Sequence, residues 1–303
     1  MTPPRVAIVI PTFNSLSATK DCLESIEWAR HTHTSVVVVD SGSIDGTREY
    51  VKSVPWVSAV DGSPDMWWAA ATNAGCSLAV RTLGVEAVAL LNCDCTWDET
   101  SFVALRASFL RKPDDIHCSR VLVKSPRLLL TAGGVVRRSG LVSLRGFFEP
   151  ADTTYPEGEV QWCGGMGTLF SASLWSQLGG FDERSFPQYY ADADFCLRAR
   201  KAGRTVWYCA SSVVVNDRAS SASYVPKVGA RLSDLALVLA SRRSPANVPD
   251  TLRFYRRHAG LRLPAALAHE YWQTLGSGAK RVVLSSARRL LRLDKGATRR
   301  ARP

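Results

Sequence analysis

Four short apolar runs, separated by stretches with helical spacing, set the pattern of the first hundred residues. The runs are Val6–Ile10, Val36–Val39, Val57–Val60 and Ala87–Leu91. Continuous apolar runs of this length are typical of strands that are buried on both faces of a parallel sheet. Apolar residues recur at helical spacing over Ala18–Ile26 and Ala69–Leu83. Strands that alternate with helices predict an α/β fold with a doubly wound parallel sheet, which binds ligands beyond the carboxyl ends of its strands.

After Trp97 the alternation becomes less regular. The pattern predicts a β-ribbon over Leu128–Phe148, interrupted by glycines, and an amphipathic helix over Asp192–Ala202 that ends at Gly203. The other expected elements are a Gly-rich segment at Val160–Thr168, a short helix at Ser171–Leu178, and strands at Thr205–Tyr208 and Val213–Val215. The remainder is expected to be mainly helical and basic.

The composition indicates a globular protein with a basic end. Of 303 residues, 46% are apolar, which suffices for a large core and excludes disorder. The formal net charge is +11, but Val225–Pro303 holds 17 Lys and Arg against four acids, or +13, which leaves −2 for the preceding 224 residues. A nucleic-acid-binding function is disfavoured, because the main domain is nearly neutral and carries no nucleic-acid-binding motif.

The cysteines and the hydropathy bear on the compartment. Eight cysteines occur without a CxxC pair and mostly within apolar runs, as expected for buried free thiols in a reducing cytoplasm. The first four residues lead at once into a strand-like run, so no signal peptide is expected. No stretch approaches the ~18 apolar residues that span a bilayer. We therefore expect a cytoplasmic protein, soluble or peripheral on the inner face of the membrane.

Polar residues follow the first two expected strands, in the segments Val9–Asn14 and Val38–Thr47. These segments resemble the first two loops of inverting family 2 glycosyltransferases, which hold the nucleotide of a sugar donor. The resemblance implies that Thr12 and Asp40 contact the base and ribose and that Asn14 belongs to the same donor site. The chemistry agrees, because a carboxylate accepts hydrogen bonds from a ring N–H or a ribose hydroxyl. A role for Asp40 in forming the turn alone is the alternative.

The fourth expected strand is followed by Asn92-Cys-Asp94. This tripeptide stands where the family has its DxD motif, so the resemblance implies that Asp94 binds a divalent cation beside the donor diphosphate. A carboxylate at a strand end suits that ion. Asn92 lacks a charge and is expected to orient the ribose or the loop. A soft-metal site at Cys93 and Cys95 is disfavoured, because two thiols without further ligands make a poor zinc site.

The segment Tyr189–Arg198 resembles the family's EDxDxxxR sequence at the start of a helix, with Ala191 in place of the usual Glu. Inverting transfer needs one carboxylate to take the proton of the attacking hydroxyl. The resemblance assigns that role to Asp192. Asp194 matches the second acid and is expected to pair with Arg198, four residues on along the same helix face. Capping of the helix by the two acids is the alternative.

Further residues are assigned to the site from their place in the series. Trp67, Trp68 and Trp162 are expected either to stack on sugars or to lie in the core, and Gly164 and Gly165 to let the backbone approach the sugar. Asn73 is assigned to the donor loop, where many family members have Arg just before Asn and this chain has Thr72. In place of the family's late metal-binding His, the chain offers Asn216 or Asp217. The expected cofactor is accordingly Mg²⁺ or Mn²⁺.

The resemblance implies a GT-A fold with a mixed sheet over residues 1–220. It is divided into a Rossmann-like nucleotide-sugar-binding half (1–97) and an acceptor half (98–220), and a basic helical region follows at 221–303. It also implies inverting transfer from a UDP- or dTDP-sugar, rhamnose or another hexose, to a saccharide or lipid-linked acceptor in bacterial surface-polysaccharide assembly. A non-catalytic scaffold of the same fold is the alternative. A sugar nucleotidyltransferase is disfavoured, since the first strand lacks a Gly-rich phosphate loop.

The basic end carries a separate hypothesis. Tyr271–Leu293 mixes Leu and Val with Arg and Lys at irregular helical spacing. Such a helix can lie on an anionic membrane surface, where each cation contributes ~1 kcal/mol. A solvated basic helix is the alternative.

Overall fold

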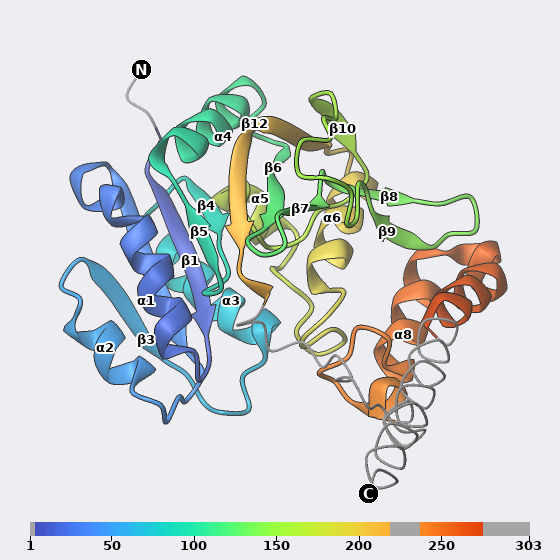
Figure 1. The fold of residues 1–303 in the computed structure, drawn as a ribbon, viewed down its shortest axis with the longest axis horizontal. Helices are drawn as coiled ribbons and strands as arrows, with labels where there is room; N and C mark the ends of the chain where they lie inside the picture. Colours follow the sequence, from blue (N-terminus) through green and yellow to red (C-terminus); the bar gives the residue numbers. More distant parts are fainter. Residues whose placement is uncertain (1–3, 219–236, 275–303) are drawn as a thin grey trace, which may run out of the picture. The chain divides into compact units, whose positions relative to one another are not determined.

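The computed structural model describes residues 4–218 and 237–274. Its first half follows the predicted alternation of strands and helices (Figure 1). The elements up to the fourth strand are β1 (Val6–Thr12), α1 (Leu16–Ser25), η1 (Glu27–His31), β2 (Thr34–Asp40), α2 (Thr47–Ser53), β3 (Val57–Asp61), α3 (Trp68–Arg81) and β4 (Ala87–Leu90). These four strands run parallel in the order β4-β1-β2-β3, which confirms the predicted parallel arrangement of the first four strands.

The second half turns the sheet into a mixed one. Its elements are β5 (Cys95–Trp97), α4 (Glu99–Arg111), β6 (Ile116–Val123), β7 (Leu128–Thr131), β8 (Gly134–Val136), β9 (Val142–Leu144), β10 (Gly158–Val160), β11 (Thr168–Ser171), α5 (Ala172–Gln177), α6 (Ala191–Lys201) and β12 (Val206–Asn216). The sheet continues from β4 through β11, β6 and β12 to β10. Because β11 is antiparallel to both neighbours, the sheet is mixed, which confirms the mixed sheet expected for a GT-A fold.

The ribbon predicted over Leu128–Phe148 divides between two sheets. Its first strand, β7, joins β6, whereas β8 and β9 pair with each other in a separate two-stranded sheet. The short helix and the amphipathic helix predicted downstream are present as α5 and α6.

Three other elements differ from the sequence prediction. The two strands expected at Thr205–Tyr208 and Val213–Val215 are one strand, β12, whose register on β6 shifts between Cys209 and Val213. The bulge takes up residues 210–212, which include the polar Ser211 and Ser212 between the two expected strands. Helix α4 and strand β6 were not predicted. Asp98 caps α4 by accepting a hydrogen bond from the Ser101 backbone N–H at 2.8 Å.

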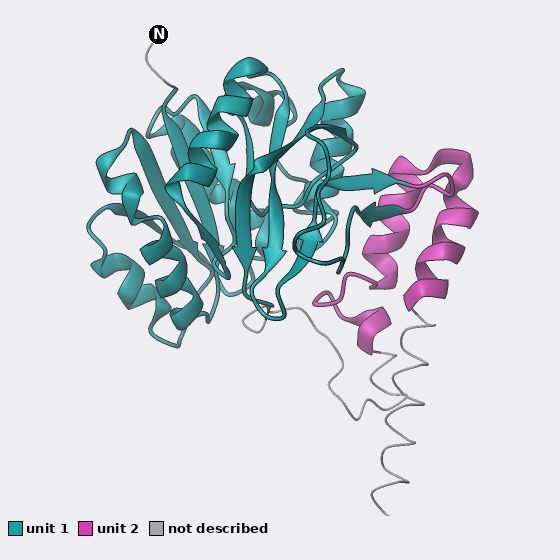
Figure 2. Ribbon diagram, turned by 45° about the horizontal axis from the view of Figure 1, so that its top comes forward, with its two compact units in different colours: residues 1–136, 142–221 teal, residues 137–141, 222–303 magenta. Residues whose placement is uncertain are grey.

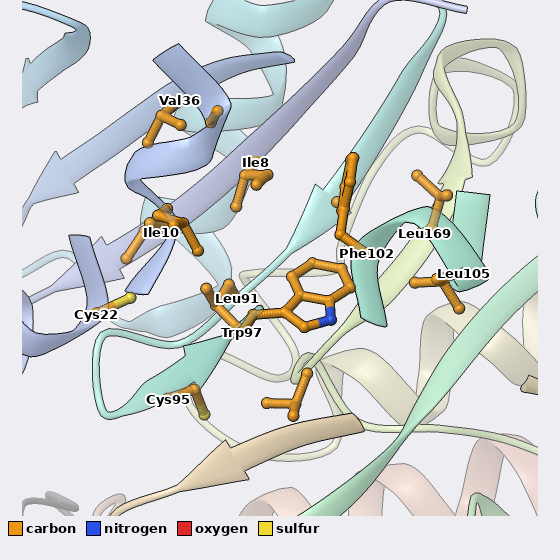
Figure 3. Close-up of a cluster of buried hydrophobic side chains, with 14 of the residues drawn as sticks. Ile8, Ile10, Cys22, Val36, Leu91, Cys95, Trp97, Phe102, Leu105 and Leu169 are labelled. Atoms are coloured by element: carbon orange, nitrogen blue, oxygen red, sulfur yellow. The ribbon is translucent and has the colours of Figure 1, made fainter. Parts of the chain in front are cut away.

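The two faces of β1 are buried against different helices. Ile8 and Ile10 lie in a cluster with residues of α1, with the buried Trp97 of β5 and with the buried Phe102 of α4 (Figure 3). On the opposite face Val9 meets α3 at Gly75, where an added Cβ would lie 2.4 Å from Val9 Cγ1. A glycine is therefore required for α3 to pack this closely. Burial on both faces explains why β1 is apolar throughout.

The chain forms two compact units, shown in Figure 2. Unit 1 comprises residues 1–136 and 142–221, and unit 2 comprises residues 137–141 and 222–303. Within the described part of unit 2, α8 (Val248–His258) is followed by η3 (Gly260–Arg262) and by helical residues 263–274. The basic stretch assigned to a surface helix lies mostly outside the described residues, from 275 onward. No described helix has the length and apolar character needed to cross a membrane.

Candidate active site

The first two loops of the site are joined at the carboxyl ends of β1 and β2. Thr12 and Asp40, the last residues of these strands, are paired in register. The Asn14 side-chain oxygen accepts a hydrogen bond from the Ile44 N–H at 2.8 Å, and the Asn14 N–H donates to Ser43 Oγ at 2.8 Å. The Thr12 hydroxyl is hydrogen-bonded to that of Thr19 at 2.9 Å and is buried. Thr12 and Asn14 therefore shape the donor loops through bonds within the protein.

Asp40 has one satisfied carboxylate oxygen and one that lacks a partner. Its Oδ2 accepts hydrogen bonds from the backbone N–H groups of Gly42 (3.1 Å) and Ser43 (3.0 Å) and from Arg48 Nε (3.1 Å). Its Oδ1 is buried without a hydrogen-bond partner among the described residues. A buried, unpaired carboxylate oxygen is costly, so this atom is ready to accept a bond from a ligand. Arg48, in the first turn of α2, was missed because its sequence position gave no sign that it reaches Asp40.

Trp68 connects the loop after β4 to the Gly-rich segment before β11. Its indole Nε1 donates to the Asn92 side-chain oxygen at 2.9 Å. Its ring lies on Gly165, where an added Cβ would be 2.3 Å from Trp68 Cζ2. The indole N–H is thus bound by Asn92, and the ring packs against the Gly165 backbone. Trp68 therefore packs between the loop at Asn92 and the segment at Gly165. A side chain at position 165 would clash with the indole ring, which explains the glycine.

Asp94 is half-buried beside a second carboxylate. Burial raises the pKa of Asp94, and the negative charge of Asp217 raises it further. The Asp217 N–H donates to the Asp94 carbonyl at 2.7 Å, and Asn216 Nδ2 lies 3.4 Å from the same oxygen. Asp94, Asp217 and Asp21 line one small cavity together with Lys124, whose Nζ is 3.2 Å from Asp217 Oδ2.

The donor set at Asp94 suits a cation that is completed by substrate. Within residues 4–218 and 237–274, no three His, Cys, Asp or Glu side chains are arranged to hold a metal by themselves. Mg²⁺ typically binds proteins through one or two carboxylates and takes its other ligands from phosphates and water. Asp94, with a pKa raised beside Asp217, fits that pattern. Asn216 directs its amide nitrogen to Asp94 and Cys95, so Asp217 is the neighbouring carboxylate in the cavity.

Asp192 lies in the first turn of α6 against the Gly-rich segment. Its Oδ1 accepts a hydrogen bond from the Ala193 N–H at 2.8 Å, and an added Cβ on Gly164 would lie 3.4 Å from its Oδ2. Burial raises the pKa of Asp192. Hydrogen bonds from the Ala193 and Gly165 N–H groups lower this pKa, but burial has the larger effect. The N-cap of α6 is Tyr190, and no side-chain bond caps the helix. Asp192 therefore binds a first-turn N–H of α6 without being its N-cap residue.

Asp194 and Arg198 form the predicted pair, but its role is to hold a turn. Asp194 is completely buried, and its Oδ2 is 2.7 Å from Arg198 Nε. The two terminal nitrogens of Arg198 donate to the carbonyls of Leu178 and Gly180, each at 2.7 Å. The pair thereby fixes α6 to the turn that precedes Phe181. The distinction between Asp192 and Asp194 is thus one of environment, since Asp194 is neutralised by Arg198.

Two other expected site residues also serve packing. The Asn73 side-chain oxygen accepts from the Phe181 N–H at 2.9 Å, and its nitrogen donates to the Phe181 carbonyl and to Glu183. Trp162 Nε1 donates to the Val135 carbonyl at 3.3 Å, and its ring covers Gly134. Trp67 is the N-cap residue of α3 and is half-buried. Trp68 nevertheless joins the loops at Asn92 and Gly165, and Asp192 lies against the same Gly164–Gly165 segment.

Comparison with known proteins identifies the family. The chain matches Glycosyl transferase family 2 over residues 7–172, which is more than half its length. This protein belongs to glycosyl transferase family 2. The matched range contains both donor loops and Asp94, while α6 with Asp192 follows it. The enzyme is a glycosyltransferase, so the scaffold alternative is not favoured.

The chain is also similar in sequence to mycobacterial rhamnosyltransferases. The chain is 28% identical to the N-acetylglucosaminyl-diphospho-decaprenol L-rhamnosyltransferase of Mycobacterium tuberculosis, over an alignment covering 73% of this chain and 80% of the relative. The corresponding protein of a second strain of that organism matches equally. This family 2 enzyme is thus rhamnosyltransferase-like in sequence.

Solved structures confirm the predicted GT-A fold. The mannosyltransferase PcManGT of Pyrobaculum calidifontis, in complex with GDP-Man and Mn²⁺, is similar with a TM-score of 0.54 and 18% identity, covering 98% of this chain and 80% of that one. GalNAc-T7 with UDP, GalNAc and Mn²⁺ gives a TM-score of 0.58 at 13% identity, over 83% of this chain and 50% of that one. This chain thus spans half the length of GalNAc-T7.

Proposed function

We propose that this family 2 enzyme transfers a hexose, with inversion, from a UDP- or dTDP-sugar to a lipid-linked saccharide at a membrane surface. The acceptor class is supported by the mycobacterial relative, whose name specifies an N-acetylglucosaminyl-diphospho-decaprenol acceptor and rhamnose as the sugar. The observation that carries the chemistry is Asp192, a half-buried carboxylate beside Gly164 and Gly165 that forms no ion pair with another described residue.

In the proposed reaction Asp192 is the general base. The acceptor hydroxyl gives its proton to the carboxylate while its oxygen bonds to the anomeric carbon of the donor sugar. The bond from that carbon to the diphosphate oxygen breaks, and the nucleoside diphosphate leaves with the electron pair. A carboxylate whose pKa is raised by burial is the better proton acceptor of the two acids on α6. Asp194 is unsuited to act as the base, because its carboxylate is already paired with Arg198.

Donor binding is proposed for the loops after β1, β2 and β4. Asp40 Oδ1, which has no hydrogen-bond partner in the part of the chain that the structure describes, would accept a hydrogen bond from the base N–H or from a ribose hydroxyl. Asp94, with Asp217 beside it, would hold a divalent cation, which supplies charge compensation for the diphosphate when bound. Two of the similar structures contain Mn²⁺. Mg²⁺ and Mn²⁺ are therefore the ions to test.

The proposal is tested by assaying transfer directly. The full-length enzyme is incubated with UDP- and dTDP-hexoses, a synthetic N-acetylglucosaminyl-diphospho-lipid, and Mg²⁺ or Mn²⁺. Mass spectrometry detects the disaccharide, and nuclear magnetic resonance assigns its anomeric configuration. We expect a product of inverted configuration from dTDP-rhamnose or a related donor. A product of retained configuration would reject Asp192 as the base, and absence of product with every donor would reject the substrate class.

A further inference from the structure

Unit 2 exposes an apolar stripe that begins in η3 and continues along one side of helical residues 263–274. The stripe consists of Leu261, Ala265, Ala268 and Trp272, all exposed, of which Leu261 is 103% and Trp272 79% exposed. Their separations of four, three and four residues place them on one side of a helix. Large exposed apolar side chains in such a row mark an interaction surface rather than the scatter of a normal surface.

The opposite side of this segment is what holds it in unit 2. Ala266 is fully buried, and the Glu270 carboxylate accepts a hydrogen bond from the Tyr255 hydroxyl of α8 at 2.9 Å. His269 lies 3.2 Å from the Ser139 hydroxyl of the 137–141 segment. The segment therefore has a packed side and an apolar outer side, and the outer side has no packing role among the described residues.

The charge of unit 2 indicates that the partner of this surface is anionic. Its described residues contain eight arginines and two acids, and every one of the arginines is exposed. The first acid, Asp250, is 1% exposed and paired with Arg253. The second, Glu270, is half-buried on Tyr255. The described surface of unit 2 is thus positive, with arginines that include Arg256 and Arg262 close in sequence to Leu261.

We propose that the stripe Leu261–Ala265–Ala268–Trp272 and the arginines of unit 2 form a docking surface for an anionic lipid membrane. Trp272 and Leu261 insert at the level of the lipid headgroups, where an aromatic ring with a polar N–H is favoured. The arginines bind the lipid phosphates. A protein partner would need matching acidic groups, whereas an anionic bilayer offers both the negative charge and the apolar layer. The proposal goes beyond the transfer reaction, and it is tested without a sugar donor.

The test is sedimentation of the full-length protein with vesicles. One set is phosphatidylcholine alone, and the other is an equal mixture of phosphatidylcholine and phosphatidylglycerol. We expect pelleting with the mixed vesicles only, and weaker pelleting at high salt. The double variant Leu261→Ser/Trp272→Ser should bind at least about tenfold more weakly, because each apolar side chain loses its transfer free energy into the membrane. Both side chains are exposed, so the variant should unfold at the wild-type temperature.

Controls separate the surface from the rest of the chain. Leu110→Ser removes another exposed leucine (52% exposed) from α4 of unit 1 and should leave pelleting unchanged. Arg256→Gln/Arg262→Gln should weaken pelleting as well, through charge alone. All variants keep the basic residues after Thr274. Differences in pelleting between them therefore come from the substituted residues of the described surface. Calorimetric binding of UDP and dTDP should be the same for the wild type and the stripe variant.

Several outcomes would overturn the proposal. These are equal pelleting of wild type and stripe variant, equal pelleting with neutral vesicles, and no pelleting at all. Dimerisation of the wild type that the stripe variant abolishes, seen by size-exclusion chromatography without vesicles, would assign the stripe to a second copy of the chain. Failure of the enzyme to transfer sugar from any donor would reject the proposed reaction and leave the vesicle result standing.

Discussion

At the scale of single residues, the two acids of α6 have the same chemistry and opposite surroundings. Asp194 is fully buried and bound by Arg198, whereas Asp192 faces the Gly164–Gly165 segment with a pKa raised by burial. A carboxylate that is neutralised by a guanidinium is a poor base, and one with a raised pKa is a better one. Environment therefore distinguishes the proposed base from the structural acid.

Asp192→Asn should reduce kcat by about 10²-fold or more, because proton abstraction is lost while the donor loops are untouched. Its affinity for UDP or dTDP should stay within about twofold of the wild type, measured by calorimetry. Asp114→Asn, at an exposed acid on the surface, is the matched control and should retain full activity. Near-normal turnover by a folded Asp192→Asn enzyme would reject the assignment.

The raised pKa of Asp192 also links activity and stability to pH. The rate should fall as the pH drops through this pKa, since the base must be ionised. For stability the sign is opposite: a carboxyl whose folded pKa lies above its unfolded value contributes stability below the unfolded pKa, and this is lost as the pH rises through the folded pKa. At neutral pH Asp192→Asn should therefore raise the Tm. A lower Tm, measured by calorimetry, would contradict the burial argument.

Asp94 should control metal-dependent donor binding. We expect Asp94→Asn to weaken the binding of UDP or dTDP in Mn²⁺ by about tenfold or more, and EDTA to do the same to the wild type. Asp21→Asn, which removes another acid from the same cavity without the backbone link to the β12 end, should have a smaller effect. Unchanged affinity in EDTA would show that the Asn-Cys-Asp loop binds the nucleotide without a cation.

At the scale of elements, loops are held by side chains that reach between helices and turns. Arg198 ties α6 to the Leu178–Gly180 turn, and Asn73 ties α3 to Phe181 just after it. Trp68 joins α3 to the loops at Asn92 and Gly165. The positions of the site loops therefore depend on side chains that the sequence had assigned to ligand binding, namely Asn73, Arg198 and Trp68.

Replacement of Arg198 by Met should lower the free energy of unfolding by about 3–5 kcal/mol, because it leaves the buried Asp194 carboxylate and two turn carbonyls without their donor. Arg200→Met on the same helix removes a pair with the exposed Glu159 and should cost less than about 1 kcal/mol. Urea denaturation measures both. Equal losses for the two variants would mean that Arg198 does not fix the turn.

At the scale of the whole molecule, charge is divided between the two units. The sequence places a net +13 in Val225–Pro303 and −2 before it. In the described part of unit 2 all the arginines are exposed and both acids are buried or half-buried. A positive surface separate from the donor loops allows membrane attraction and sugar transfer to be changed independently, which the vesicle experiments with the stripe variant measure.

The sequence by itself determined the four parallel strands, the loops at their carboxyl ends and the family. These follow from local properties, because apolar runs, turn residues and the Asp192–Arg198 spacing are visible within short segments. Helix α4 and strand β6 escaped prediction, since their mixed apolar and polar residues give a pattern that only their neighbours α1 and β12 explain.

Only the tertiary structure decided which polar residues are free to act. Sequence spacing cannot show that Asn73 bonds to Phe181, that the Trp68 ring lies on Gly165, or that Arg198 neutralises Asp194. Nor can it show that one oxygen of Asp40 is left without a partner. The physical reason is that hydrogen bonding and burial depend on atoms brought together from distant parts of the chain, and these fix the chemistry of each carboxylate.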